Sequence, residues 1–185
     1  MYGYLKLGRG LAAALALALI VPTAPAVASI ETSEAKAEAS DAATMARSHM
    51  DEVFGDKQLK AGQYVWRSGV EDGPARLVVS LGDQLAYLYR GDELVAVSTV
   101  STGTDKHPTP TGIFEVLAKQ PFHRSLKYEN APMPFMQQID KYGIALHAGH
   151  NPGYPASHGC IRLPAAFAKK LYGITSVGAT VMIGT

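Results

Sequence analysis

LVVSLGDQLAYLYRGDELVAVSTV, residues 77–100, contains three short apolar runs separated by two turns. The runs occupy 77–81, 85–89 and 94–100, and Gly82-Asp83 and Gly91-Asp92 stand between them. Apolar runs of this length, bounded by glycine and aspartate, are typical of β-strands joined by tight turns. The stretch therefore predicts an antiparallel meander of three strands.

The chain that follows the meander extends the same kind of structure. Strands are predicted over 113–117, 143–147 and 180–183, and a helix is predicted after Pro164. Residues 118–142 carry three prolines among apolar side chains and suggest a long loop or lid. The fold class is therefore mainly β: an antiparallel, β-sandwich-like domain with one or two short helices. We expect this domain over 57–185, with its core from about residue 75.

The N-terminal end has a different character. Lys6 and Arg9 precede an apolar run at 11–21, which ends in the small residues of an A-x-A pattern at 26–28. This is the pattern of an export signal peptide over 1–28, since the apolar run is short for a membrane span of roughly 20 residues. Residues 29 to about 43 are rich in Ala, Ser, Glu and Thr and have no aromatic residue, and a weak helical pattern follows over 41–54. Residues 29–56 therefore predict a flexible tether with a possible short helix.

Composition narrows the class of function. The chain has 185 residues, with 17 Lys and Arg against 16 Asp and Glu. Such a balance gives no strong field to attract nucleic acid, so we expect no nucleic-acid partner. Its single cysteine, Cys160, is unusual for an exported chain, because oxidising compartments favour paired cysteines.

Cys160 lies in a segment that suits a nucleophile. The segment is Ser157-His158-Gly159-Cys160-Ile161-Arg162, and His147 ends the strand before it. A cysteine attacks as thiolate and is activated by a neighbouring imidazole, which either histidine can supply. We hypothesise that the amides of Gly159 and Cys160 bind an oxyanion, and that Arg162 either holds a substrate carboxylate or ties down the loop.

A zinc site is the alternative for these side chains. His147, His150, His158 and Cys160 are ligand types that zinc takes. Between His147 and Arg162 there is no carboxylate to support the ligands, and Arg162 would place a positive charge near a cation. We therefore expect no metal and no cofactor, and we expect His150 to be a solvated loop residue.

The chain resembles the L,D-transpeptidase catalytic-domain family of bacterial cell-wall enzymes. The resemblance runs from about Arg76 to the C-terminus through Ser101-Thr102-Gly103, Thr109-Pro110-Thr111-Gly112-Ile113-Phe114, His147 and the segment 157–162. It implies that Cys160 is the nucleophile and His147 the general base. It also implies that Ser157, His158 and Gly159 shape the turn around the nucleophile, and that Arg162 orders it.

The family further implies a reaction and a location. Cys160 would attack a peptidoglycan tetrapeptide stem, release D-alanine and form a thioester, and an amine acceptor would then complete a 3→3 cross-link. Such an enzyme acts in the periplasm or cell envelope. Three alternatives stay open. The enzyme could hydrolyse the thioester, or it could attach a protein to peptidoglycan as the acceptor or remove such an attachment. The domain could also be a non-catalytic wall-binding module.

Two further expectations concern the site. The stretch between His147 and Ser157, residues 148–156, is shorter than in well-known members of the family, and a shorter loop at the cleft would alter the choice of acceptor. A thiolate–imidazolium pair would make activity rise at or below neutral pH rather than near pH 8.5.

Overall fold

The computed structural model describes residues 29–70 and 72–185. The predicted signal peptide, 1–28, lies outside the described residues. The described chain forms two helices and eleven strands. In order, these are β1 (Ser29–Ile30), α1 (Ser33–Phe54), β2 (Tyr64–Trp66), β3 (Ala75–Ser80), β4 (Leu85–Arg90), β5 (Glu93–Thr99), β6 (Gly112–Glu115), β7 (Ala118–Arg124), β8 (Pro132–Gln138), β9 (Ala145–Ala148), β10 (Ile161–Leu163), α2 (Ala165–Ile174) and β11 (Thr180–Gly184).

The strands form two sheets, which confirms the mainly β fold class. One sheet has the order β1-β6-β11-β3-β4-β5-β2 and the other β10-β9-β8-β7. The meander β3-β4-β5 is antiparallel, as predicted. The sheets are nevertheless mixed, because β11 runs parallel to β3 and β10 runs parallel to β9. Long connections make these parallel pairs possible: residues 149–160 join β9 to β10, and the chain from β4 to α2 separates β3 from β11.

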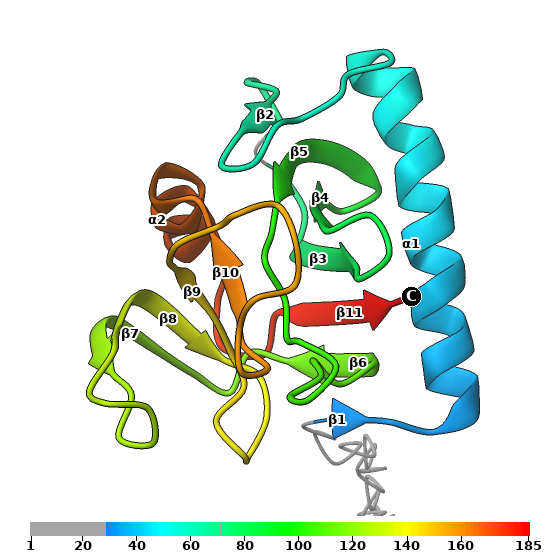
Figure 1. The fold of residues 1–185 in the computed structure, drawn as a ribbon. Coiled ribbons are helices and arrows are strands. Elements are labelled where there is room, and N and C mark those ends of the chain that lie inside the picture. The colour runs from blue at the N-terminus through cyan, green and yellow to red at the C-terminus, as the bar shows by residue number, and fades with distance from the viewer. Residues whose placement is uncertain (1–28, 71) are drawn as a thin grey trace, which may run out of the picture.

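The seven-stranded sheet is covered on both faces (Figure 1). Alternate residues of its strands, such as Leu77 and Val79, pack with the four-stranded sheet and α2 in one apolar core. The residues between them, such as Val78 and Tyr87, pack beneath α1 in a second core. Burial on both faces explains why the meander reads as nearly continuous apolar runs rather than an alternating pattern.

The flexible tether predicted for 29–56 is instead a strand and a long helix. α1 begins at an N-cap, Thr32, whose hydroxyl accepts a hydrogen bond from the amide of Ala35 at 3.2 Å. Its buried face consists mainly of alanine and ends in Met50. Alanine has the highest helix propensity and lets a helix approach a sheet closely, so the lack of aromatic residues did not indicate disorder. No helix of the described residues has the length and apolar character needed to cross a membrane.

Residues 118–142, predicted as an irregular loop or lid, contain the antiparallel hairpin β7–β8. β8 pairs with β9 only at Gln137 and Gln138, so its earlier residues have β7 as their partner strand. Pro132 and Pro134 lie in that earlier part and Pro121 lies on the edge strand β7, where a missing N–H group breaks few ladder hydrogen bonds. The prolines therefore mark a projecting hairpin rather than a loop.

Candidate active site

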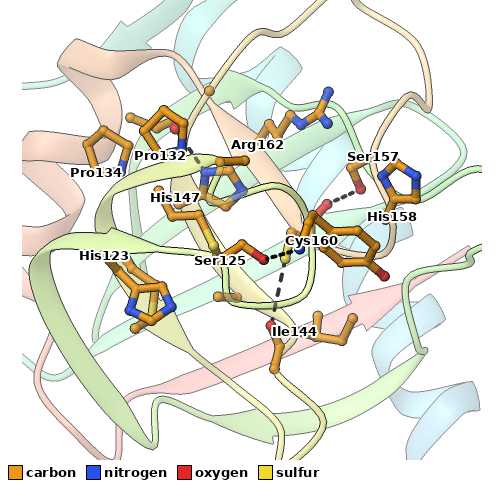
Figure 2. A pocket seen from close by; sticks show the side chains of 18 of the residues that line it. His123, Ser125, Pro132, Pro134, Ile144, His147, Ser157, His158, Cys160 and Arg162 are labelled. Atoms are coloured by element: carbon orange, nitrogen blue, oxygen red, sulfur yellow. Dashed lines mark hydrogen bonds between the residues drawn. The ribbon is translucent and has the colours of Figure 1, made fainter.

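The pairing of β9 with β10 brings His147 and Cys160 to one face of the four-stranded sheet. In the parallel register, Leu146 lies beside Ile161 and His147 beside Arg162. Leu146 and Ile161 are buried in the core, so His147 and Arg162 point to the opposite face. Cys160, two residues before Arg162, joins them there, and the three side chains line one cavity (Figure 2).

This cavity has a volume of about 810 Å³ and two kinds of wall. The hairpin β7–β8 and the loop before β9 supply apolar side chains, including Leu126, Met133 and Ile144. Cationic or titratable side chains line the rest: Lys127, Arg162 and four histidines (His123, His147, His150 and His158). The described lining residues include no Asp or Glu, so the cavity favours a substrate that carries carboxylates.

Ser157 holds the turn that presents the nucleophile. Its hydroxyl donates to the carbonyl oxygen of Cys160 at 2.5 Å and accepts from the amide of Gly159 at 3.0 Å. Gly159 has a φ of +110°, and a Cβ there would lie 2.6 Å from the Ile144 side chain. Glycine is therefore required at this position. Because the Gly159 amide already donates to Ser157, this amide does not support the oxyanion role hypothesised for it, and the amide of Cys160 remains the candidate.

A second loop, residues 101–109, braces the nucleophile turn from behind. The Thr109 hydroxyl donates to the carbonyl oxygen of Gly159 and accepts from the amide of Gly103, both at 2.8 Å. Ser101 and Arg162 exchange two backbone hydrogen bonds of 3.0 Å. The family resemblance included Ser101 and Thr109 but implied no role for them. In the structure, both residues hydrogen-bond to the segment that contains Cys160.

Gln84 is a supporting residue that the sequence did not reveal. Its side chain donates to the Thr102 hydroxyl at 2.7 Å and accepts from the Thr102 amide at 3.0 Å. The Thr102 carbonyl in turn accepts from the amides of Ala156 and Ser157. Gln84 lies in a turn of the meander, far from Cys160 in sequence, and no pattern there distinguished it from an ordinary turn residue.

His147, the candidate base, has one ring nitrogen held by a hydrogen bond. It is buried, and its Nδ1 lies 2.8 Å from the carbonyl oxygen of Ala148. A carbonyl oxygen only accepts, so Nδ1 carries the hydrogen and Nε2 is left with a free lone pair. Burial lowers the pKa of His147 from its ordinary value of 6.5, and the charges of Arg162 and His123 lower it further against the opposing Ala148 hydrogen bond. The imidazole is therefore neutral at pH 7.

Cys160 is a protonated thiol in this site. It packs against the apolar cluster Met133, Met136 and Ala145, and its Sγ donates to the carbonyl oxygen of Gly143 at 3.8 Å. Burial raises the pKa of the thiol above its ordinary value of 9.0. Together with the lowered pKa of His147, this direction favours a neutral thiol–imidazole pair over the predicted thiolate–imidazolium pair.

Asp140 shapes the loop that contacts the sulfur. Its buried carboxylate accepts from the amides of Tyr142 at 2.9 Å and Ile144 at 2.7 Å. These bonds fold residues 140–144 so that the Gly143 carbonyl faces Cys160 and the Ile144 side chain packs on Gly159. Sequence reasoning missed Asp140, which lies within the stretch that was left unassigned.

The other predicted residues are placed around the cavity. The exposed ring of His158 stacks on Tyr128, with 4.6 Å between ring centroids, and lies 4.8 Å from His107. The side chain of Arg162 runs along Gly149, and neither salt bridge found among the described residues involves it. His150 is exposed on the cavity rim. No group of three His, Cys, Asp or Glu within 29–70 and 72–185 is arranged to hold a metal.

Known proteins share the part of the chain that builds this cavity. The family model of the L,D-transpeptidase catalytic domain (YkuD) matches residues 74–183. A Bacillus licheniformis protein named as an L,D-transpeptidase YkuD is 30% identical over 135 residues, which cover 68% of this chain and 77% of that protein.

Solved structures share the fold. An L,D-transpeptidase from Mycobacterium smegmatis has a TM-score of 0.57 at 21% identity, with 60% of this chain and 58% of that chain covered. One from Stackebrandtia nassauensis has a TM-score of 0.56 at 23% identity, with 75% and 63% covered. The match thus spans less than two thirds of these solved chains. The family model and the Bacillus relative carry the assignment: the chain belongs to the L,D-transpeptidase catalytic-domain family.

Proposed function

We propose that the chain is an exported L,D-transpeptidase that uses Cys160 to cross-link peptidoglycan stems. The observation that carries the proposal is the placement of His147, in β9, and Cys160, directly before the adjacent parallel strand β10, in one cavity that has no acidic lining among the described residues. A nucleophile beside a base with a fixed tautomer is the arrangement that acyl transfer through a thioester requires.

In the first half-reaction, the thiol of Cys160 attacks the carbonyl of the third residue of a tetrapeptide stem. Nε2 of His147 takes the thiol proton as the S–C bond forms. The imidazolium then gives this proton to the leaving amine, the C–N bond breaks, and D-alanine departs, leaving a thioester on Cys160. A neutral pair suits this sequence, because the base is free before attack and becomes an acid only afterwards.

Two other groups support the same step. The amide of Cys160 is our candidate donor to the oxyanion that forms during attack. Arg162 and Lys127 are our candidates for the stem carboxylates, since both line the cavity. The backbone of Arg162 also exchanges two hydrogen bonds with that of Ser101, which fixes the start of β10 beside the cavity.

In the second half-reaction, His147 removes a proton from the acceptor amine, which attacks the thioester and forms the new C–N bond of the 3→3 cross-link. The C–S bond then breaks, and the imidazolium returns the proton to the sulfur of Cys160. Water or an amine of a wall-attached protein can replace the stem amine without any change in the residues involved. These outcomes define a hydrolase and a protein-attaching or protein-detaching enzyme as the rival functions. A non-catalytic wall-binding module would need neither Cys160 nor His147.

Mass spectrometry of the intact protein tests the nucleophile. One solved L,D-transpeptidase of the same fold, LdtMt1, is in complex with imipenem; its TM-score is 0.54 at 19% identity. Exposure of residues 29–185 to a carbapenem should add one adduct mass, and Cys160→Ser should remove it. No adduct on the native chain, or an equal adduct on the serine variant, contradicts the proposal.

Defined stem peptides test the acceptor. We expect a tetrapeptide stem to lose D-alanine and to form a dimer when a second stem offers its side-chain amine at millimolar concentration. Accumulation of cleaved monomer alone would identify a hydrolase. Transfer to a lysine of an added wall protein, in preference to the stem amine, would identify a protein-attaching enzyme.

Export is part of the proposal because the substrate lies outside the cytoplasm. The sequence of residues 1–28 supports it through its basic start, apolar run and A-x-A end. Cleavage after Ala28 would leave Ser29, the first residue of β1, as the new N-terminus. The N-terminal sequence of the protein recovered from the envelope fraction tests this: a start at Met1 contradicts cleavage.

A further inference from the structure

The ring of His158, at the edge of the cavity, contacts two other aromatic rings that come from different parts of the chain. His158 precedes Gly159 in the nucleophile turn, His107 belongs to the bracing loop 101–109, and Tyr128 lies in the connection between β7 and β8. The rings of Tyr128 and His158 are 4.6 Å apart and inclined by 28°, and those of His107 and His158 are 4.8 Å apart and inclined by 42°. His158 is thus held between two partners.

The stack fixes a residue whose backbone leads directly to the nucleophile. Gly159, next to His158, adopts a φ of +110° that glycine alone adopts readily, and the amide of Cys160 follows it. A glycine is also the residue that loses most conformational freedom when it is ordered. Restraint of the His158 side chain therefore restrains the part of the turn that has the greatest intrinsic freedom.

Each outer ring is itself anchored. The His107 amide donates to the carbonyl of Thr104 at 2.9 Å, and the loop approaches the turn so closely that a Cβ on Gly103 would lie 2.9 Å from the Cα of Gly159. At the hairpin end, the Tyr128 amide donates to the Ser125 hydroxyl at 3.1 Å and its carbonyl accepts from Ala131 at 2.8 Å. Both neighbours of His158 are therefore presented by preformed turns.

His107 differs from its two partners in one respect. Tyr128 and His158 line the cavity, whereas His107 is not among the residues that line it. Substitution of Tyr128 can therefore change substrate contacts directly, but substitution of His107 reaches the reaction only through His158 or through its own loop.

We propose that His107 and Tyr128 are positioning residues that hold His158, and through it the amide and sulfur of Cys160, in the arrangement needed for acyl transfer. The proposal rests on the proposed function. Its consequence is a loss of turnover rather than of substrate binding when His107 is removed, since misplacement of reacting groups lowers the rate of the chemical step.

Kinetics of His107 variants on a stem tetrapeptide test this, with the mature chain as the enzyme. We expect His107→Ala to lower kcat about tenfold with KM unchanged, and His107→Phe, which keeps a flat ring, to recover most of the loss. Phe122→Ala is the control, because Phe122 is an exposed aromatic residue of the β7–β8 hairpin that, like His107, is absent from the cavity lining. It should behave as the native chain.

Nuclear magnetic resonance gives a readout that does not depend on turnover. Stacking on Tyr128 should shift the His158 ring protons upfield relative to those of the exposed His150. Tyr128→Phe should preserve that shift and Tyr128→Ala should abolish it. His107→Ala should alter the His158 resonances and leave those of His150 in place.

The outcomes separate the two proposals. A native chain that does not react with stems or carbapenem refutes the proposed function, and the His158 resonances still show whether the stack forms. An active native chain refutes the positioning role if His107→Ala has native kcat, changes only KM, or is not recovered by His107→Phe. A lower kcat with unaltered His158 resonances refutes it as well.

Discussion

At the scale of single residues, the main feature of the candidate pair Cys160 and His147 is that both pKa shifts favour the neutral forms. Burial lowers the pKa of His147 and raises that of Cys160, so the two groups disfavour the ion pair from both sides. The thiol is then activated only when substrate is bound and the imidazole takes its proton. Such a cysteine also escapes oxidation more readily than a standing thiolate, which would suit an unpaired thiol under the export proposed above.

This neutrality sets the pH dependence of carbapenem acylation. His147 must be unprotonated to act as the base, and its pKa lies below 6.5, so the rate should fall only as pH drops below 6.5. The Cys160 pKa lies above 9.0, so the rate should stay level from pH 7 to about 9 instead of following a thiolate. Stopped-flow measurement of the acylation rate, both below pH 6.5 and from pH 7 to about 9, tests the fall on the acidic side and the level region above it.

A histidine variant provides the control for that profile. His147→Gln keeps a polar side chain without a titrating base, so it should lower the acylation rate at least about 100-fold and abolish the acid limb. An acylation rate of the native chain that increases toward acidic pH would support the thiolate–imidazolium pair instead of the neutral pair. A native rate that climbs tenfold per pH unit toward 9 would show that Cys160 ionises without His147.

Gly159 carries a second prediction at this scale. Gly159→Ala must adopt a φ of +110° and place its Cβ 2.6 Å from Ile144, which should lower the free energy of unfolding by about 2 kcal/mol and suppress acylation. Gly173→Ala, inside α2 with open space around it, is the matched control and should raise stability by about 0.5 kcal/mol. Urea denaturation and intact mass follow both. Equal changes in the free energy of unfolding for Gly159→Ala and Gly173→Ala would show that alanine is not strained at position 159.

The sequence predicted residues whose chemistry is specific and missed residues whose role is geometric. Cys160, His147 and the turn 157–159 were candidates because a thiol, an imidazole and a glycine suit nucleophilic chemistry, and the structure places Cys160 and His147 in one cavity. Gln84 and Asp140 were not, since an amide or carboxylate that bonds to backbone groups has no sequence signature when its partners lie far along the chain. The Gly159 amide was assigned to an oxyanion because the Ser157 hydroxyl that occupies it could not be foreseen.

At the scale of elements, strands with local sequence signals were predicted, whereas elements that depend on distant packing partners were not. The meander was predicted because its turns and apolar runs are local signals. The flexibility predicted for the tether and the irregularity predicted for 118–142 were wrong because order there depends on partners. The alanine face of α1 needs the sheet beneath it, and the prolines of β8 are tolerated only where β9 has ended. The continuous apolar runs of β3–β5 were the one available sign that something covers both faces.

Lys119 offers a test of how elements are joined at the site. From β7, its ammonium donates to the carbonyls of Tyr172 at 2.7 Å and Thr175 at 2.5 Å, at the C-terminal end of α2, and lies 4.3 Å from the centroid of the Tyr172 ring. A cation there satisfies open carbonyls and complements the helix dipole. Lys119→Met should therefore lower the free energy of unfolding by about 1 kcal/mol, measured by urea denaturation. Lys169→Met, on the exposed side of α2, is the control and should change it by less than about 0.5 kcal/mol.

At the scale of the whole molecule, the seven-stranded sheet separates support from chemistry. α1 covers one face, and the four-stranded sheet that carries His147 and Cys160 packs on the other (Figure 1). The N-terminal residues of the described chain therefore act on the stability of the central sheet without reaching the cavity. The two roles can be separated experimentally, because a change beneath α1 alters the folded fraction while the site stays built by β9 and β10.

Ala39 is the position at which this separation is sharpest. It is fully buried, and α1 approaches β11 so closely there that a Cβ on Gly184 would lie 2.4 Å from the Ala39 carbonyl oxygen. Ala39→Leu should overpack the contact and lower the free energy of unfolding by about 1–3 kcal/mol. Ala37→Leu, exposed on the same helix, should change it by less than about 0.5 kcal/mol. Both variants should keep the native carbapenem acylation rate per folded molecule. Equal stabilities of the two variants would show that α1 does not pack on the sheet. A slower acylation rate in Ala39→Leu alone would show that the packing of α1 and the chemistry of the cavity are coupled across the seven-stranded sheet.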